Sequence, residues 1–359
     1  MLKNSIKYIK KNFIPLSVSV ICIYALYLRI MHLYWHTPWF DETYYLSPAH
    51  GTFLQFLKEI PKVESCSYLS GDLFLFYPFF KIFSHNKWGL TIPCIIATII
   101  GFYLLYLISK RYFKSIWAYL ITFGIICFNA TLINHATEIR TYAILPTVAL
   151  VTLYLFQRIA DLNFKLNIPR RIFTAISFIL VIWFHIYGIL MFISCFLFVL
   201  LSKYKEKDFK NYLKDGVSFT VIILCFAMPL WLYSVFGPHY SYAKFNFDAF
   251  CFIPNPLHNI TGFLKGIFCN LVGFKKLYFL FIGVVIPFIF SYEDRLKQLL
   301  FLLFLIIIPL SLILISDVIL KYWFIQRQFI WIMPLFAFFL GWTWDSFFIL
   351  LKRKNGLLK

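Results

Sequence analysis

The chain has 359 residues, of which 61% are hydrophobic and only 14% are charged. Soluble domains carry about 25% charged residues, so this composition excludes an ordinary soluble protein and indicates an integral membrane protein. The net charge of +19 would suit a nucleic-acid-binding protein. Basic residues in cytoplasmic loops explain the charge better, and no nucleic-acid partner is expected.

Ten apolar segments are long enough to be membrane spans, because a helix of about 20 residues crosses roughly 30 Å of hydrocarbon. Their hydrophobicity is continuous rather than alternating, which favours helices over a β-barrel. The sequence therefore predicts an all-α polytopic membrane protein with spans at residues 13–33, 88–108, 115–133, 139–158, 171–186, 188–202, 217–236, 277–292, 298–318 and 328–350.

The loops between these spans predict the orientation. With the N-terminus inside, short inner segments hold 22 of the 34 basic residues, as the positive-inside rule requires. Both termini are then cytoplasmic, and the chain is expected to lie in the cell (inner) membrane as one membrane-embedded domain, residues 1–359, without a soluble C-terminal domain. Two large outer loops, 34–87 and 237–276, would cover the active site. The short apolar run 73–83 is predicted to be a surface helix in the first of them.

The eight cysteines are scattered and contain no C-x-x-C pair, so a zinc ribbon or a redox motif is not expected. No other metal-binding cluster is evident, and no metal is predicted. Cys66, Cys251 and Cys269 fall in predicted outer loops, and the sequence leaves open whether two of them form a disulfide.

Ionisable residues from distant parts of the chain fall near the outer membrane boundary. Charged groups next to hydrocarbon are costly and usually functional, so their convergence predicts a site there. They include Asp41, Glu42, Asp72, Glu138, Arg140, His185, Lys321 and Arg327.

Each of these residues also has a purely structural interpretation. Long cations such as Lys321 and Arg327 can extend to the interface. Glu138 and Arg140 can pair with each other, and a histidine such as His185 can be a hydrogen-bonded core residue. Helix capping explains one acid of the pair at positions 41 and 42, but not both.

The chemical interpretation combines an acid with cations at a membrane surface. A carboxylate can take a proton from an attacking hydroxyl, and arginine and lysine can hold a phosphate. This combination suits a substrate with a lipid tail and a head of phosphate plus sugar. A single base with attack from the opposite face predicts inversion at the sugar carbon.

Four motifs resemble membrane glycosyltransferases of the GT-C class, and most of all the branch with protein O-mannosyltransferases and lipid A aminoarabinose transferases. The resemblance covers nearly the whole chain. It rests on "WFDETYY" (39–45), "EIRTYAIL" (138–145), "WFHIYGILMF" (183–192) and "RQFIWIMPLFAFFLG" (327–341).

This resemblance implies a GT-C-like helix bundle that uses an undecaprenyl- or dolichyl-phosphate sugar on the non-cytoplasmic face, with no cofactor. It implies that Asp41 is the general base, with Glu42 beside it and Glu138 as a second acid. The phosphate contacts would be Arg140 and Arg327, with Lys321. The expected substrate-binding residues are Tyr44, Tyr45, Asp72, Tyr142 and His185.

One departure from the family pattern lies before the predicted surface helix. Family members often have H-P-P-L there, whereas this chain has "SGDLFLFYP". Asp72 therefore either replaces the histidine's role, or that role is absent.

Two other functions remain open at this point. A polyprenyl-lipid or glycan transporter or flippase would place charges at mid-membrane depth and often has repeated halves. A ligase of lipid-linked glycans would use Arg and His without a carboxylate base. The position of the charges, the lack of a repeat and the presence of Asp41 favour a transferase whose acceptor is a lipid, a glycan or a protein.

Overall fold

The computed structural model describes residues 2–38, 42, 46–59, 71–161, 168–185, 187–203, 205, 207, 209–236, 283, 285, 289, 296–320 and 329–354. These residues form helices and turns and contain no strand. The elements are α1 (Leu2–Trp35), η1 (Ser47–His50), α3 (Phe53–Glu59), α4 (Asp72–Phe83), α5 (Lys87–Leu90), α6 (Ile92–Tyr112), α7 (Ile116–Phe128), α8 (Ala130–His135), α9 (Thr141–Asp161), α10 (Ile168–Phe184), α11 (Gly188–Lys203), α12 (Phe209–Phe236), α16 (Leu296–Leu320) and α17 (Ile332–Lys354).

Nine of the ten predicted spans contain a helix in the described part of the chain, which confirms an all-α polytopic membrane protein. Within the residues listed above, four stretches are long and apolar enough to cross a membrane, at Phe13–Trp35, Lys87–Tyr112, Phe209–Pro229 and Ile332–Lys352. Five more apolar helices among these residues are shorter and do not meet the length criterion. Most of the tenth prediction, 277–292, lies outside the described residues.

The predicted span 115–133 is not one continuous helix. It is divided at Asn129, whose extended backbone (φ −67°, ψ 120°) ends α7 and begins α8. The Asn129 side chain accepts a hydrogen bond from Leu132 N at 2.9 Å, which is the usual role of asparagine at a helix N-cap. The polar cap thus overrides the apolar run, and α8 becomes a short separate helix.

The short helix predicted at 73–83 is present as α4, which has 12 residues, and its position at the membrane surface stays a prediction. At 1.5 Å per residue it is about 18 Å long, well short of the hydrocarbon thickness. Because α4 is too short to cross the membrane, the next long helix, α6, begins at the same end of the bundle as α4.

Helix α17 packs closely against α7 because both contribute small residues. A Cβ on Gly341 would lie 1.9 Å from Thr122 Oγ1 and 2.8 Å from Ala118 O. Thr122 Oγ1 also donates to Ala337 O at 3.3 Å. Small residues of this kind let membrane helices approach each other, and here they fix the position of α17 in the bundle.

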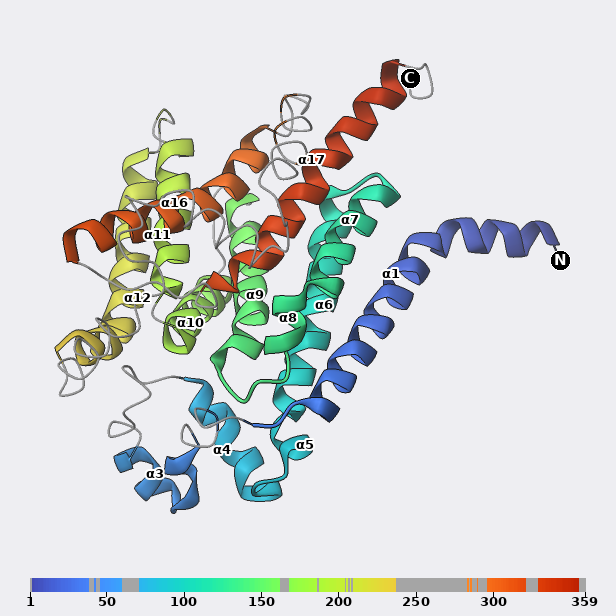
Figure 1. The fold of residues 1–359 in the computed structure, drawn as a ribbon. Coiled ribbons are helices and arrows are strands. Elements are labelled where there is room, and N and C mark those ends of the chain that lie inside the picture. The colour runs from blue at the N-terminus through green and yellow to red at the C-terminus, as the bar shows by residue number, and fades with distance from the viewer. Residues whose placement is uncertain are drawn as a thin grey trace.

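Helices α3, α4 and α5 lie together at one end of the bundle, where α1 ends and α6 begins (Figure 1). We call this the α4 end. Lys87 Nζ holds the chain there, because it donates to the carbonyl oxygens of Leu33, Tyr34 and His36 at 3.1–3.2 Å. A lysine at a helix C-terminus also complements the helix dipole.

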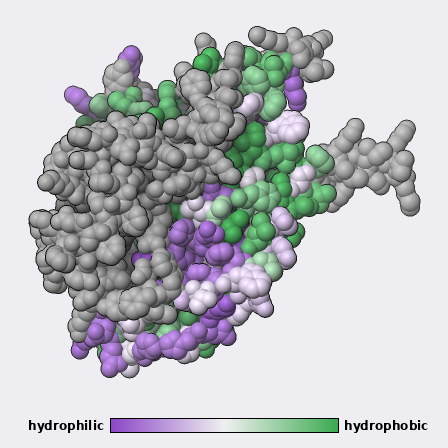
Figure 2. All heavy atoms as spheres, in the orientation of Figure 1, coloured by the Kyte–Doolittle hydropathy of each residue, from purple (hydrophilic) through white to green (hydrophobic). Residues whose placement is uncertain are grey.

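The surface agrees with a membrane environment for the bundle. Figure 2 shows hydrophobic residues along the helices and hydrophilic ones gathered toward the α4 end. Large apolar side chains on α1, such as Leu16, Val20 and Ile23, are exposed. Exposed apolar residues spread over a long helix match contact with lipid rather than water.

Candidate active site

Glu42 connects the segment after α1 to the segment before α9. Its carboxylate is buried and accepts a hydrogen bond from Ile139 N at 2.7 Å through Oε1. Its Oε2 lies 2.9 Å from His36 Nε2. Both carboxylate oxygens therefore have partners, and the residue holds two distant parts of the chain together.

Two histidines at the end of α1 extend this contact. The His32 and His36 rings stack with centroids 5.4 Å apart. His32 Nδ1 lies 3.2 Å from the hydroxyl of the buried Thr137. The end of α1 thus contacts the turn between α8 and α9 at two points, through Glu42 and through Thr137.

That turn carries a second carboxylate–imidazole pair. His135 is the last residue of α8, and its Nδ1 lies 2.5 Å from Glu138 Oε2. The Glu138 side chain is 3% exposed and that of His135 is 21% exposed. The histidine is therefore the member of the pair that reaches the surface.

Asp72 brings a third buried carboxylate to the same region. It begins α4, and the preceding Gly71 N donates to Trp183 O at 2.6 Å, which joins α4 to the end of α10. Thr141 Oγ1 donates to Phe184 O at 2.6 Å, which joins the start of α9 to the same end of α10. The structure thus brings the segments of three acids, which are far apart in the sequence, to one end of the bundle.

His185 follows the end of α10 and is fully buried. Its Nδ1 accepts a hydrogen bond from Tyr187 N at 3.2 Å, so in the neutral ring the proton is on Nε2. Its ring lies 6.0 Å from that of Tyr142, which is in turn 5.9 Å from the His135 ring. Tyr142 therefore connects His185 with the His135–Glu138 pair.

Arg140 lies two residues before Tyr142, and its guanidinium is 5.6 Å from the centre of the Tyr142 ring. The Arg140 side chain is half-buried and follows Glu138 by two residues. A guanidinium at this position could contact an anionic group of a substrate.

Arg29 is a buried arginine that sequence reasoning missed, and it contacts the end of α7. Arg29 on α1 donates to Cys127 O and Ile126 O, each at 3.2 Å, and to Ala25 O at 3.0 Å. Ile126 and Cys127 are in the last turn of α7, where carbonyl groups lack partners within the helix. The positive charge also complements the negative end of the α7 dipole.

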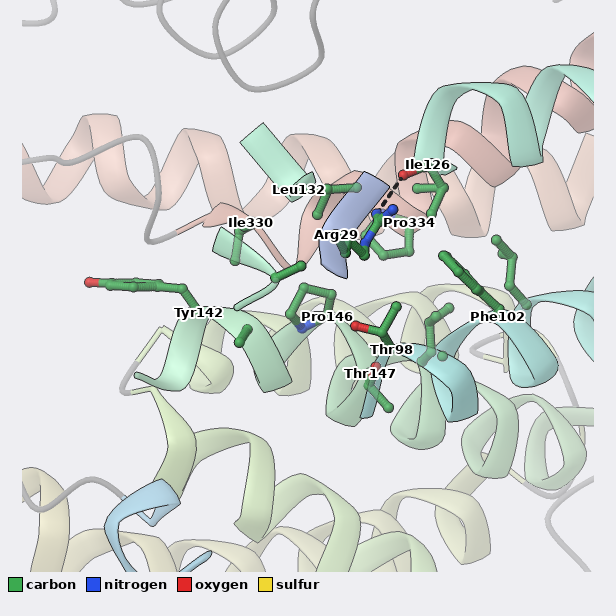
Figure 3. Close-up of a pocket in the computed structure, with 15 residues that line it drawn as sticks. Arg29, Thr98, Phe102, Ile126, Leu132, Tyr142, Pro146, Thr147, Ile330 and Pro334 are labelled. Carbon is green, nitrogen blue, oxygen red and sulfur yellow. Dashed lines mark hydrogen bonds between the residues drawn. The ribbon is translucent and has the colours of Figure 1, made fainter. Parts of the chain in front are cut away.

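Figure 3 shows Arg29 beside a small cavity of about 50 Å³, with its guanidinium directed toward Ile126 and the Tyr142 hydroxyl pointing away. The cavity adjoins the α8–α9 turn, where Ala136 and Tyr142 line it, and its lining is mainly apolar. It includes Thr98, Phe102, Leu132, Pro146, Thr147, Ile330 and Pro334.

Five predicted site residues lie outside the described part of the chain, namely Asp41, Tyr44, Tyr45, Lys321 and Arg327. Their neighbours in sequence are described. Phe329, two residues after Arg327, packs its ring 5.3 Å from that of Tyr187. Among the described residues no group of three His, Cys, Asp or Glu side chains could hold a metal ion, and the expected lack of a metal stays a prediction.

Sequence reasoning missed three histidines, His32, His36 and His135. A histidine in or beside an apolar helix gives little signal by itself. The spacing H-x-x-E at positions 135–138 is a local signal for the second pair, because residues three apart can face each other in helical turns. The contact of His36 with Glu42 depends on the path of the chain after α1 and has no comparable signature.

Comparison with known proteins returns one match. Residues 73–233 match the family model described as dolichyl-phosphate-mannose-protein mannosyltransferase. The match runs from α4 into α12 and includes Glu138, Arg140, Tyr142 and His185. No curated protein and no solved structure matches the chain.

Proposed function

Because the chain is a membrane glycosyltransferase of the GT-C class, we propose that it moves a sugar from a polyprenyl-phosphate donor to an acceptor hydroxyl. The matching family is described by dolichyl-phosphate mannose and a protein acceptor. For this chain the proposed donor is an undecaprenyl- or dolichyl-phosphate sugar, and the acceptor is a lipid, a glycan or a protein.

One observation carries the proposal. Three buried carboxylates, Glu42, Asp72 and Glu138, lie on segments that hydrogen bonds join at the α4 end of a helix bundle, and Arg140 follows Glu138 by two residues. Burying several acids near lipid is expensive, and an acidic cluster beside a cation fits a substrate with both hydroxyl groups and a phosphate. The family match includes Glu138 and Arg140 and supports a polyprenyl-phosphate sugar donor.

In the proposed reaction Asp41 removes the proton from the acceptor hydroxyl. The acceptor oxygen forms a bond to the anomeric carbon while the bond to the phosphate oxygen breaks, and the electron pair leaves on the phosphate. Arg140, Arg327 and Lys321 stabilise the charge that develops there. Attack opposite to the leaving group inverts the configuration.

Glu42 acts as a positioning residue in this scheme, since its hydrogen bonds to Ile139 and His36 hold the segment next to Asp41. Glu138 is the second acid near the sugar or the acceptor. The remaining substrate contacts are proposed for Tyr44, Tyr45, Asp72, Tyr142 and His185.

The proposal places the reaction on the non-cytoplasmic face, with both termini in the cytoplasm. The ends of the helices support this orientation. Basic residues Lys110 and Arg111 end α6 and Lys203 ends α11, and both helix ends lie opposite the α4 end (Figure 1). Basic residues mark the cytoplasmic side of membrane proteins.

The test is a donor-turnover assay on the Asp41→Asn variant. Native membrane extract supplies the acceptor, and dolichyl- and undecaprenyl-phosphate mannose serve as radiolabelled probes. Loss of a positioned base predicts a fall in polyprenyl-phosphate release of about 10³-fold, with donor binding retained because asparagine preserves the shape. The control is Asp161→Asn, which makes the same chemical change at the last residue of α9, away from the α8–α9 turn. This variant should leave turnover unchanged.

Wild-type turnover by Asp41→Asn would refute Asp41 as the base. Equal loss in Asp41→Asn and Asp161→Asn would mean that the assay reports folding rather than chemistry. Glucose and aminoarabinose donors in the same assay then identify the sugar.

A further inference from the structure

The Glu138–His135 pair has the arrangement of a carboxylate that orients an imidazole. The carboxylate is buried, and its Oε2 faces the Nδ1 of the ring at 2.5 Å. An ionised carboxylate can only accept hydrogen bonds. Nδ1 must then carry the proton, which leaves Nε2 of the neutral ring with a free electron pair.

Exposure distinguishes the two members of this pair. The Glu138 side chain is 3% exposed and the Glu42 side chain is fully buried, whereas the His135 side chain is 21% exposed. A buried carboxylate exchanges protons with water slowly unless a neighbour connects it to the surface. His135 provides such a connection, and its ring also lies 5.9 Å from Tyr142.

A hydrogen bond joins the residue that follows the proposed base to the residue that follows Glu138. Asp41 precedes Glu42 in the chain, and Glu42 bonds to Ile139 N. Glu138 precedes Ile139. The segment that carries the proposed base is therefore bonded to the segment that carries the imidazole.

We propose that His135, oriented by Glu138, takes up at Nε2 the proton that the acceptor hydroxyl loses and passes it to water. This rests on the proposed function. The hydroxyl O–H bond breaks, the proton moves through Asp41 to His135 Nε2, and the electron pair of the broken sugar–phosphate bond leaves on the phosphate. The resulting imidazolium is stabilised by the Glu138 carboxylate, as in other carboxylate–histidine pairs.

The charged and titratable groups that face His135 are consistent with this role. Glu138 lies on the same turn and Tyr142 on α9, and His32 at the end of α1 contacts Thr137, two residues after His135. Arg140 contacts the Tyr142 ring with its guanidinium 5.6 Å from the ring centre. Glu138 is thus the carboxylate that contacts His135 among the described residues.

The experiment uses the full-length chain in vesicles and separates a structural from a proton-transfer role. His135→Asn keeps an N–H where Nδ1 donates to Glu138 but has no group in place of Nε2. His135→Ala removes both. Both variants should lose about 10²-fold in turnover, and imidazole added to His135→Ala should restore turnover several-fold while leaving His135→Asn low.

His85→Ala is the matched control, because His85 lies at the same end of the bundle and its described contacts are the rings of His50 and Phe80. It should keep wild-type turnover with and without imidazole. If His135→Asn keeps wild-type turnover, the histidine serves only to hold Glu138 and the inference is wrong. Lack of imidazole rescue in a folded His135→Ala variant also counts against it.

The two proposals fail in different ways. If the wild-type chain releases no polyprenyl phosphate from any donor, the proposed function fails. If the wild-type chain is active and the His135 variants match it, only the role of His135 fails.

Discussion

Asp345 and Glu138 are both buried carboxylates, but their partners differ. Asp345 on α17 accepts hydrogen bonds from Ser115 N at 2.6 Å and from Lys114 N at 3.1 Å. These amides precede α7, so the carboxylate acts as a cap at the positive end of its dipole. Glu138, at the other end of the bundle, contacts the imidazole of His135.

The difference teaches how to separate structural acids from functional ones. A backbone amide neither gains nor loses a proton at neutral pH, so these contacts of Asp345 fix α17 against α7. An imidazole can both accept and release a proton, so Glu138 contacts a group that can move one. Burial alone, which the two acids share, does not distinguish them.

The largest expected effect is on turnover in the Glu138→Gln variant. The amide cannot stabilise an imidazolium, so polyprenyl-phosphate release should fall by about 10² to 10³-fold. The midpoint of thermal unfolding should change little, because the shape is preserved. A double variant with His135→Ala should lose no more than either single variant, because both changes disable one unit.

Two outcomes would remove the contrast between the acids. Glu138→Gln with wild-type turnover would show that the Glu138 charge has no part in the reaction. Strictly additive losses in the double variant would show that Glu138 and His135 act separately.

The second effect is on stability, in the Asp345→Ala variant. It leaves the buried amide of Ser115 and the partly buried amide of Lys114 without their acceptor, which costs about 2–3 kcal/mol of unfolding free energy. The variant should unfold at lower temperature in detergent and keep the turnover of the wild type per folded molecule. Asp345→Asn, which retains an acceptor oxygen, should lose less.

The smallest effect is expected from Arg29→Lys. Lysine keeps the charge near the end of α7 but cannot reach both Ile126 O and Cys127 O with one planar group. The loss should be about 1 kcal/mol in unfolding free energy, with turnover per folded molecule close to that of the wild type. A larger loss of turnover than of stability would assign Arg29 to the reaction instead.

Much of the fold is predictable from the sequence, since continuous apolar runs mark the helices and basic residues mark one end of the bundle. The division of the predicted span 115–133 is harder to foresee. The apolar residues continue past Asn129, and the capping contact with Leu132 N competes with helix propagation at a single residue.

The site is predictable in part, because acids and arginine are rare in this chain and each is conspicuous. Glu42, Asp72, Glu138, Arg140 and His185 were identified in this way, and the structure brings their segments together. His36 and His135 were not identified, because what distinguishes them is the carboxylate that each one contacts. Such a pairing depends on tertiary contacts, such as that between Glu42 and Ile139 N, which are 97 residues apart.

Donor cleavage by the purified chain tests the central claim most directly. Vesicles that contain the chain and a labelled polyprenyl-phosphate sugar are given membrane extract as acceptor, and free polyprenyl phosphate is measured together with the leaflet in which intact donor lies. Sugar transfer predicts acceptor-dependent release of polyprenyl phosphate that is lost in Asp41→Asn. Movement of intact donor between leaflets without any release would contradict the account and identify a transporter.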